Sequence, residues 1–155
     1  LEDNRPSTFR KFGFTSINVN YAYAARKHRD GYNVGAPILK AFGVFQGGEL
    51  LYWPDDDGTC PLDDLQDTAA SRFDVRSSMV LFDGLRCHAV TPFEGERYSL
   101  VFFTAPDYDK TKEGDAQILQ EWGATWPTHE SQHYFRTYRA TERKLQEHLR
   151  DVWLS

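Results

Sequence analysis

The sequence is poor in cysteine and has no long apolar run. Only Cys60 and Cys87 occur, far apart and without a Cys-x-x-Cys pair, which excludes a disulfide framework and a cysteine-based structural zinc site. No apolar stretch approaches the roughly 20 residues needed to cross a bilayer, and no signal peptide is recognisable at the N-terminus. We therefore expect an intracellular protein, cytoplasmic or nuclear, with no membrane partner.

The chain also lacks a strong charge of either sign. Its formal net charge is -5, and much of the acidity lies in residues 55–67, so a general attraction to nucleic acid is not encoded. By contrast, 11 Phe, 8 Tyr and 4 Trp supply the volume of a core. At 155 residues we expect one domain over residues 1–155. Because the chain begins at Leu1 and not at Met, we expect that domain to be trimmed from something longer.

Most of the regular pattern is typical of short β-strands. Residues 14–23, FTSINVNYAY, alternate and are rich in β-branched and aromatic side chains. Residues 38–45 and 49–53 flank Gln46-Gly47-Gly48, where glycines can supply positive φ angles, and this pattern predicts a tight hairpin. Further strands are predicted at 73–75, 79–82, 87–91 and 98–104, with turns at Asp83-Gly84 and at Pro92-Phe93-Glu94-Gly95. Many short strands with such turns indicate a sandwich or barrel.

The segments outside these strands differ in character. Residues 54–72 contain six Asp and little periodicity, which favours a surface excursion or lid. In the C-terminal third, apolar side chains recur at helical spacing among charged ones, which predicts an amphipathic helix. These side chains are Tyr138, Leu145, Leu149, Val152 and Trp153. The expected fold is mainly β with peripheral α: a β-core over about 14–104 and a helical C-terminal extension over about 115–155.

One short motif has the composition of a metal site. His28 and Asp30 are two residues apart, so at the end of an extended strand both side chains point to the same face. His88, on a later predicted strand, completes a set of two His and one carboxylate, which leaves coordination positions open. The alternative is that His28 is a solvated loop residue beside Arg26 and Arg29.

Arg97 is the second unusual residue, because it opens a strand, RYSLVFF, that is otherwise largely apolar. A buried guanidinium needs an anionic partner, and its planar fork suits a carboxylate. Ser99, two positions on, can donate a further hydrogen bond to the same anion. The alternative is an ion pair between Arg97 and Asp83 or Glu94 at the rim of the barrel.

Four segments together resemble a known superfamily. HRD, FQGGEL, VLFDGLRCHAV and PFEGERYSLVFF look like the core of the Fe(II)- and 2-oxoglutarate-dependent dioxygenases, and the likeness covers about residues 14–104. Within it, the NVNY run and GERYSLVFF are most similar to algal-type oxygenases and to the TET and J-binding-protein branch, which oxidises methyl groups on DNA bases.

The resemblance implies a double-stranded β-helix, or jelly roll, with His28, Asp30 and His88 as ligands of Fe(II). It also implies that Arg97 and Ser99 bind the co-substrate 2-oxoglutarate. By analogy with relatives that place an Asn or Tyr of an early strand against that co-substrate, further candidates are Asn18, Asn20 and Tyr21. The implied activity is that of a hydroxylase, which uses O2 and 2-oxoglutarate to oxidise a C–H bond and releases succinate and CO2.

The resemblance implies a methylated nucleobase in DNA or RNA as the substrate. A basic and aromatic mouth around the HRD motif would suit nucleic acid, although an ordinary solvated rim explains the same residues. They are Arg26, Lys27, Arg29, Lys40, Tyr32, Tyr52 and Trp53. One alternative is a prolyl-hydroxylase-like oxygenase acting on a peptide or small metabolite. A second is a non-catalytic jelly-roll module that binds metal without turnover.

Overall fold

The computed structural model describes residues 12–128, and these form two antiparallel β-sheets. The four-stranded sheet has the order β1-β7-β2-β5, and the three-stranded sheet has the order β4-β3-β6. The strands are β1 (Ser16–Tyr21), β2 (Val34–Gly47), β3 (Leu50–Tyr52), β4 (Ser71–Phe73), β5 (Val80–Leu81), β6 (His88–Val90) and β7 (Phe93–Thr104). The helices are η2 (Leu62–Asp64), η3 (Asp67–Ala69), η4 (Tyr108–Lys110) and α1 (Glu113–Glu121). The mainly β class predicted from the sequence is confirmed.

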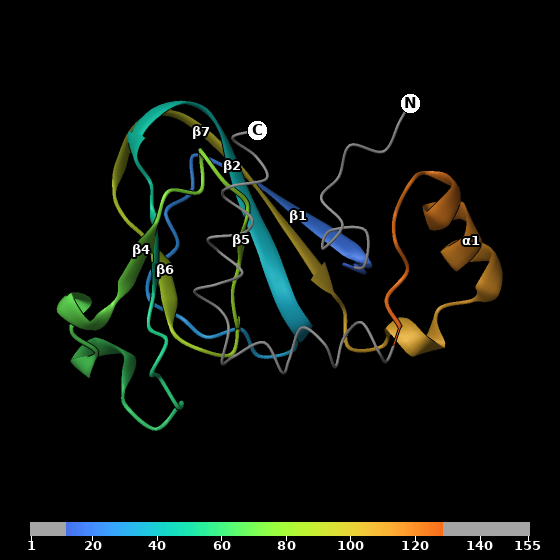
Figure 1. Ribbon diagram of the computed structural model, residues 1–155, viewed down its shortest axis with the longest axis horizontal. Coiled ribbons are helices and arrows are strands. Elements are labelled where there is room, and N and C mark those ends of the chain that lie inside the picture. Colours follow the sequence, from blue (N-terminus) through green and yellow to red (C-terminus); the bar gives the residue numbers. More distant parts are fainter. Residues whose placement is uncertain (1–11, 129–155) are drawn as a thin grey trace.

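The two sheets are joined by one bent ribbon. β2 pairs with β7 up to the partners Gly47 and Phe93, and past the corner β3 pairs with β6 at Leu50 and Val90. The same two chain segments therefore form an antiparallel pair in the first sheet and then in the second. In Figure 1 the long β1, β7 and β2 run side by side, and β4 and β6 lie toward one end. Because the ribbon bends, β6 lies across from the inner face of β7.

The predicted hairpin at residues 46–48 is wrong, because β2 and β3 belong to different sheets. Gly47 and Gly48 do adopt the expected positive φ angles of 76° and 69°. Here these backbone angles allow the chain to pass from one sheet into the other, and β3 does not fold back to pair with β2. A Cβ on Gly48 would lie 2.8 Å from Nε of Arg97, so this corner also leaves room for a guanidinium.

A shared apolar layer holds the sheets together. It is made of Leu39, Ala41, Phe45, Leu50, Tyr52, Val75, Val80 and Phe82, all at most 5% exposed. The four-stranded sheet supplies one side of this layer and β3 supplies another, which follows from the alternation of side chains along each strand. Burial on this scale, at about 25 cal/mol per Å² of apolar surface, is the main force that keeps the bent ribbon closed.

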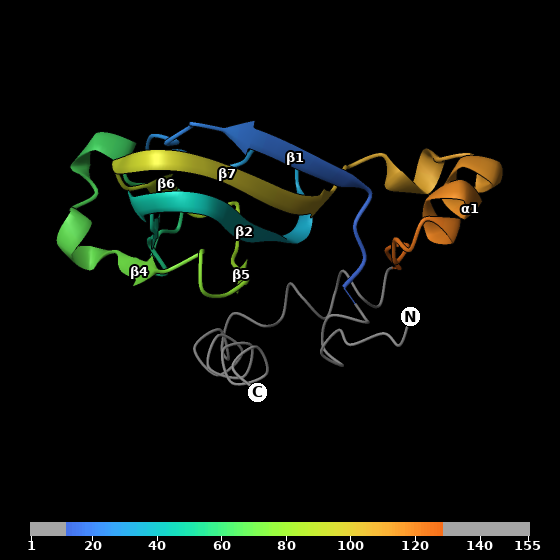
Figure 2. The same cartoon turned by 90° about the horizontal axis from the view of Figure 1, so that it is seen from above.

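Residues 54–72 are more than the surface excursion expected from their composition. They contain η2 and η3, and Leu62, Leu65 and Ala70 pack against a buried cluster that includes Trp53 and Cys87. Figure 2 shows these helices at the opposite end of the molecule from α1. The sequence pattern missed this packing because single apolar residues between aspartates have no periodicity.

The remaining strand predictions are confirmed in position, with shifted ends. The turn predicted at residues 92–95 is wrong, because β7 already begins at Phe93 and pairs with the end of β2. The strand predicted at 73–75 lies earlier, at Ser71–Phe73. Within the predicted C-terminal extension, α1 ends at Glu121, and the amphipathic positions from Tyr138 to Trp153 lie outside the described residues. No helix in the described part of the chain is long and apolar enough to cross a membrane.

Candidate functional site

The three predicted metal ligands converge in space. One ligand atom from each of His28, Asp30 and His88 lies within 4.8 Å of the other two. Oδ1 of Asp30 is 3.7 Å from Nε2 of His28 and 3.8 Å from Nε2 of His88. These spacings allow one metal ion to contact all three atoms after small side-chain movements, since such ligands bind at about 2.0–2.2 Å.

Backbone hydrogen bonds bring the ligands together. His28 and His88 form an isolated antiparallel bridge, in which each backbone N–H donates to the other residue's carbonyl at 3.0 Å. The N–H of Asp30 donates to the carbonyl of Gly84 at 2.7 Å. His28 and Asp30 therefore lie in the connection between β1 and β2, pinned to the segment around β6, and not at the end of a regular strand as the sequence suggested.

In both imidazoles, a hydrogen bond at Nδ1 fixes the orientation of the ring. Nδ1 of His28 donates to the carbonyl of Arg26 at 2.7 Å, and Nδ1 of His88 donates to the carbonyl of Arg86 at 2.9 Å. A carbonyl can only accept, so the proton of the neutral ring sits on Nδ1 and the lone pair on Nε2 faces Asp30. Burial also lowers the pKa of His88 below its ordinary value of 6.5, which keeps this ring in the neutral form that binds metal.

Asp30 is held by a residue that the sequence reading missed. Nδ2 of Asn33 donates to Oδ2 of Asp30 at 2.6 Å, which leaves Oδ1 facing the two imidazoles. Asn33 also lines the same pocket. The only sequence feature that pointed to Asn33 was its position three residues after Asp30. An Asn in a polar loop does not by itself indicate which side chain it will contact.

We expect Gly84→Ala to weaken metal binding about 10–100-fold, the usual effect of disturbing a residue that orients a ligand. The new Cβ would overlap Oδ2 of Asp30, which Asn33 keeps from moving aside. Gly31→Ala is the matched control, because its Cβ would meet no atom within 4 Å. Calorimetric titration with Mn(II) measures both variants. Equal affinities for the two would contradict this account of Asp30.

Arg97 lies in the same pocket without a counter-ion. It is 1% exposed, and it makes no ion pair with any carboxylate among residues 12–128. Its guanidinium has two long hydrogen bonds of 3.4 Å, to the carbonyls of Tyr23 and Gly48, and Nε has none. Burial accordingly lowers the pKa of Arg97. The predicted alternative of a rim ion pair with Asp83 or Glu94 is therefore wrong.

Most of the other predicted co-substrate residues face the pocket. Asn18, Asn20 and Ser99 line it, and Nδ2 of Asn20 donates to the hydroxyl of Ser99 at 3.5 Å. Tyr21 does not line it: the residue is 60% exposed, and its ring lies tilted against that of Tyr98, with the ring centroids 4.7 Å apart, on the outer face of the sheet. That prediction is wrong because neighbouring residues of a strand point to opposite faces. A residue that the sequence reading passed over, Tyr23, lines the pocket instead.

The same pocket is lined by the candidate metal ligands and by Arg97. Its volume is about 210 Å³, and its walls also include Leu39, Phe82 and Val101. That space suits a molecule smaller than a typical drug, with apolar walls and a few fixed polar groups. A ligand with both a carboxylate and a metal-chelating group matches the charged and polar residues that line this cavity.

No protein-family model matches the chain, and no curated protein matches it. What the site can do must therefore be inferred from its own chemistry, together with the sequence resemblance.

Two of the four cations in the predicted basic mouth are paired with carboxylates. Lys27 pairs with Asp67 at 2.8 Å and Arg29 pairs with Asp56 at 2.6 Å, whereas Arg26 is exposed. Tyr52 and Trp53 are buried, at 1% and 2% exposure. Lys40 donates to the carbonyl of Arg76. Of these three aromatic residues only Tyr32, at 82% exposure, is accessible enough for a base to stack on it.

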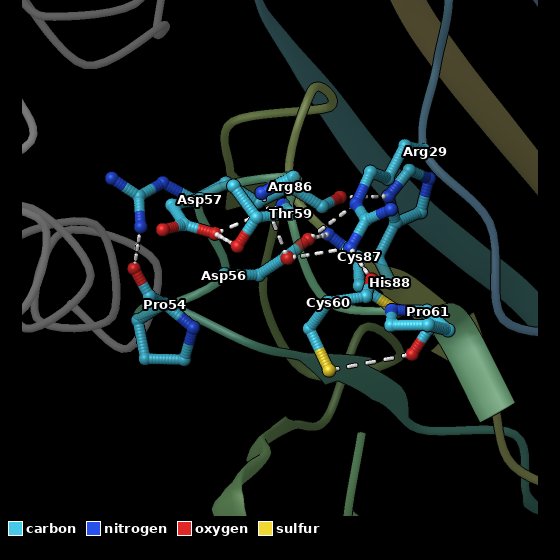
Figure 3. Close-up of polar contacts among 11 residues, drawn as sticks. Arg29, Pro54, Asp56, Asp57, Thr59, Cys60, Pro61, Arg86, Cys87 and His88 are labelled. Carbon is cyan, nitrogen blue, oxygen red and sulfur yellow. Dashed lines mark hydrogen bonds and ion pairs between the residues drawn. The ribbon is translucent and has the colours of Figure 1, made fainter. Parts of the chain in front are cut away.

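Asp56 is a buried carboxylate with four hydrogen-bond donors. Nε and Nη2 of Arg29 donate to it at 2.7 and 2.6 Å, the N–H of Cys87 at 2.6 Å, and the N–H of Gly58 at 3.1 Å. Figure 3 shows the side chain of Asp56 directed toward both Arg29 and Cys87. The Arg29 hydrogen bond is the main cause that lowers the pKa of Asp56 to about 2. Nothing in the sequence singled out this aspartate among its five neighbours in residues 54–72.

We expect Asp56 to stabilise the fold by about 2 kcal/mol near neutral pH, since its pKa falls from 3.8 in an unfolded chain to about 2. A carboxylate with a lowered pKa stabilises the protein above its unfolded value and loses that contribution as the pH falls through its folded value. The difference in unfolding free energy between the protein and Asp56→Asn should therefore shrink from pH 4 toward pH 2. Urea unfolding across that range measures it. A difference independent of pH would contradict the prediction.

Proposed function

We propose that this protein is an Fe(II)- and 2-oxoglutarate-dependent dioxygenase with a double-stranded β-helix, or jelly-roll, fold. The observation that carries the proposal is that a two-His, one-carboxylate cluster shares one small pocket with a buried arginine that has no carboxylate partner among residues 12–128. Two antiparallel sheets linked by a bent ribbon are compatible with the jelly roll. A buried arginine with no carboxylate partner among residues 12–128 is costly for stability, which favours a functional role for it.

The donor set fits iron. His28, Asp30 and His88 offer two imidazole nitrogens and one carboxylate oxygen, the combination typical of non-haem Fe(II) oxygenases. The hydrogen bonds at Nδ1 of both rings and at Oδ2 of Asp30 supply the support that such ligands need. When bound, Fe(II) supplies the redox chemistry that activates oxygen, and the protein supplies orientation and a shielded cavity.

The part of the pocket lined by Arg97 fits 2-oxoglutarate. The Arg97 guanidinium would bind the distal carboxylate in a bidentate pair, and the Ser99 hydroxyl would donate a further hydrogen bond to it. Asn20, which already contacts Ser99, orients that hydroxyl. The overall reaction balances: R–H, O2 and 2-oxoglutarate give R–OH, succinate and CO2. Oxygen accepts four electrons, two from the decarboxylated keto acid and two from the C–H bond.

We propose a methylated nucleobase in DNA or RNA as the primary substrate, and the support for it is the resemblance to the TET and J-binding-protein branch. A second candidate is a prolyl side chain in a peptide, or a small metabolite. What favours this second candidate is that Lys27 and Arg29, which were expected to meet phosphates, are occupied by Asp67 and Asp56. The two classes differ in salt dependence, because phosphate contacts weaken steeply as salt rises.

The test is succinate formation by protein reconstituted anaerobically with Fe(II) and then given 2-oxoglutarate and oxygen. Methylated DNA, methylated RNA and proline-rich peptides are compared, with His28→Ala and Arg97→Ala as inactive controls. We expect one class to stimulate succinate release, and both variants to abolish it. Metal binding without succinate above the two variants would overturn the enzyme and leave a non-catalytic metal-binding module.

A further inference from the structure

Asp56 contacts both chain segments that carry the candidate metal ligands. Arg29 stands between His28 and Asp30, and Cys87 immediately precedes His88. Arg29, in contrast to His28 and Asp30 on either side of it, does not line the pocket. Its guanidinium meets the carboxylate of Asp56, which also accepts the backbone N–H of Cys87.

We propose that Asp56 is a positioning residue for the metal centre, which sets the orientation of the His28–Asp30 segment relative to His88. The inference rests on the proposed function, since it presumes that these residues bind a metal. The two segments are joined through the backbone by the reciprocal bonds between His28 and His88 and by the bonds from Val90 to Ala25 and from Asp30 to Gly84. The bonds from Asp56 to Arg29 and to Cys87 add the side-chain link between these segments that we propose sets their orientation.

The network around Asp56 is rigid enough for this role. Its side chain is fully shielded from solvent, and Nη2 of Arg29 also donates to the carbonyl of Cys60 at 2.8 Å. The N–H of Asp56 donates to the carbonyl of Trp53, directly after β3. β3 in turn pairs with β6, at Tyr52 and His88. The carboxylate is therefore anchored to the sheet that carries His88 and holds the loop that carries the other two ligands (Figure 3).

Asp56→Asn keeps the size of the side chain but removes the charge and turns one acceptor into a donor that faces other donors. We expect the two ligand segments to lose their mutual orientation and the dissociation constant for Co(II) to rise about 10–100-fold. The visible absorption of bound Co(II), which reports ligand geometry, should change as well. Arg29→Lys provides a second variant, because an ammonium cannot reproduce the bidentate fork.

The experiment is a Co(II) titration of the full chain without 2-oxoglutarate, followed by absorption. Two control variants accompany it. Ile38→Ala loses core packing in a separate cluster, and so tests whether lower stability alone weakens binding. Glu49→Gln breaks an exposed arginine–carboxylate pair, with Arg72, away from the site. Both controls should bind Co(II) as the unmodified protein does.

The outcomes separate the two proposals. Weaker binding and an altered spectrum in Asp56→Asn, with normal binding in both controls, support the positioning role. If Asp56→Asn does not fold, Arg29→Lys is read by the same criterion. Binding within threefold of the unmodified protein, in whichever of these variants folds, overturns the positioning role while leaving the metal centre intact. Failure of the unmodified protein to bind Co(II) overturns the metal centre, and with it the proposed function.

Discussion

Replacing Arg97 by Met is expected to abolish binding of 2-oxoglutarate while leaving the protein without ligand at least as stable as before. The two effects have one cause. Arg97 is a buried cation with no carboxylate partner among residues 12–128, so its charge is unfavourable until an anion enters the pocket. Met has a similar length, carries no charge and can fill the space beside Phe45 and Phe93.

The size of the effect on binding follows from the loss of a buried, charge-assisted contact. Removing one partner of such a pair costs about 2–5 kcal/mol, or roughly 30- to several-thousand-fold in affinity. By contrast, an arginine that only stabilised the fold would lower the unfolding temperature when replaced, because buried pairs are expensive to break. The same variant therefore separates a binding role from a structural one.

Thermal unfolding with and without 2-oxoglutarate, in the presence of Mn(II), measures both effects. Ligand at 100 times its dissociation constant stabilises a protein by about 2.7 kcal/mol, so the unmodified protein should unfold at a clearly higher temperature with 2-oxoglutarate. Arg97→Met should show no such rise. An Arg97→Met protein that unfolds much earlier without ligand, yet is still stabilised by 2-oxoglutarate, would contradict the assignment.

Replacing His28 by Ala is expected to abolish metal binding with little loss of stability. The His28 side chain is 42% exposed, so truncating it creates no buried cavity. The expected effect on metal binding is large, because one of the three proposed ligands among residues 12–128 disappears and the remaining pair cannot enclose an ion. The loss should exceed the 10–100-fold that is typical of residues behind the ligands.

Mn(II) calorimetry and thermal unfolding on the same samples test this expectation. Tyr32→Ala is the control, since Tyr32 is 82% exposed and close in sequence but does not line the pocket. We expect heat of binding for Tyr32→Ala and none for His28→Ala, with nearly equal unfolding temperatures. Undiminished Mn(II) affinity in His28→Ala would show that the metal, if bound, is held elsewhere.

The residues of the candidate site could be picked out from the sequence because their chemistry is unusual for their setting. A His-x-Asp pair, a later His and an arginine at the head of an apolar strand each needed an explanation, and the structure brings them into one pocket. The residues that support them were not predictable in the same way. Asn33 and Asp56 are ordinary polar residues in polar loops, and their roles depend on which backbone groups the fold brings near them.

The errors in the fold have equally local causes. Two glycines with positive φ are compatible with both a hairpin and a corner between sheets. What produces a corner here is that β7 pairs with β2 in one sheet while β6 pairs with β3 in the other, and both partners lie far along the chain. Tyr21 was expected in the pocket, but it is one residue out of step with Asn18 and Asn20, which lie on the face of β1 that lines the pocket.

The most direct test of the dioxygenase chemistry is to supply isotopically labelled O2 and to measure the mass of the succinate formed by mass spectrometry. Enzyme is used at the concentration of 2-oxoglutarate, so that even slow turnover without a primary substrate yields measurable product. The proposed chemistry predicts that succinate gains a single heavy oxygen atom, and that His28→Ala and Arg97→Met form none. Succinate without the heavy atom, or equal succinate from the variants, would contradict it.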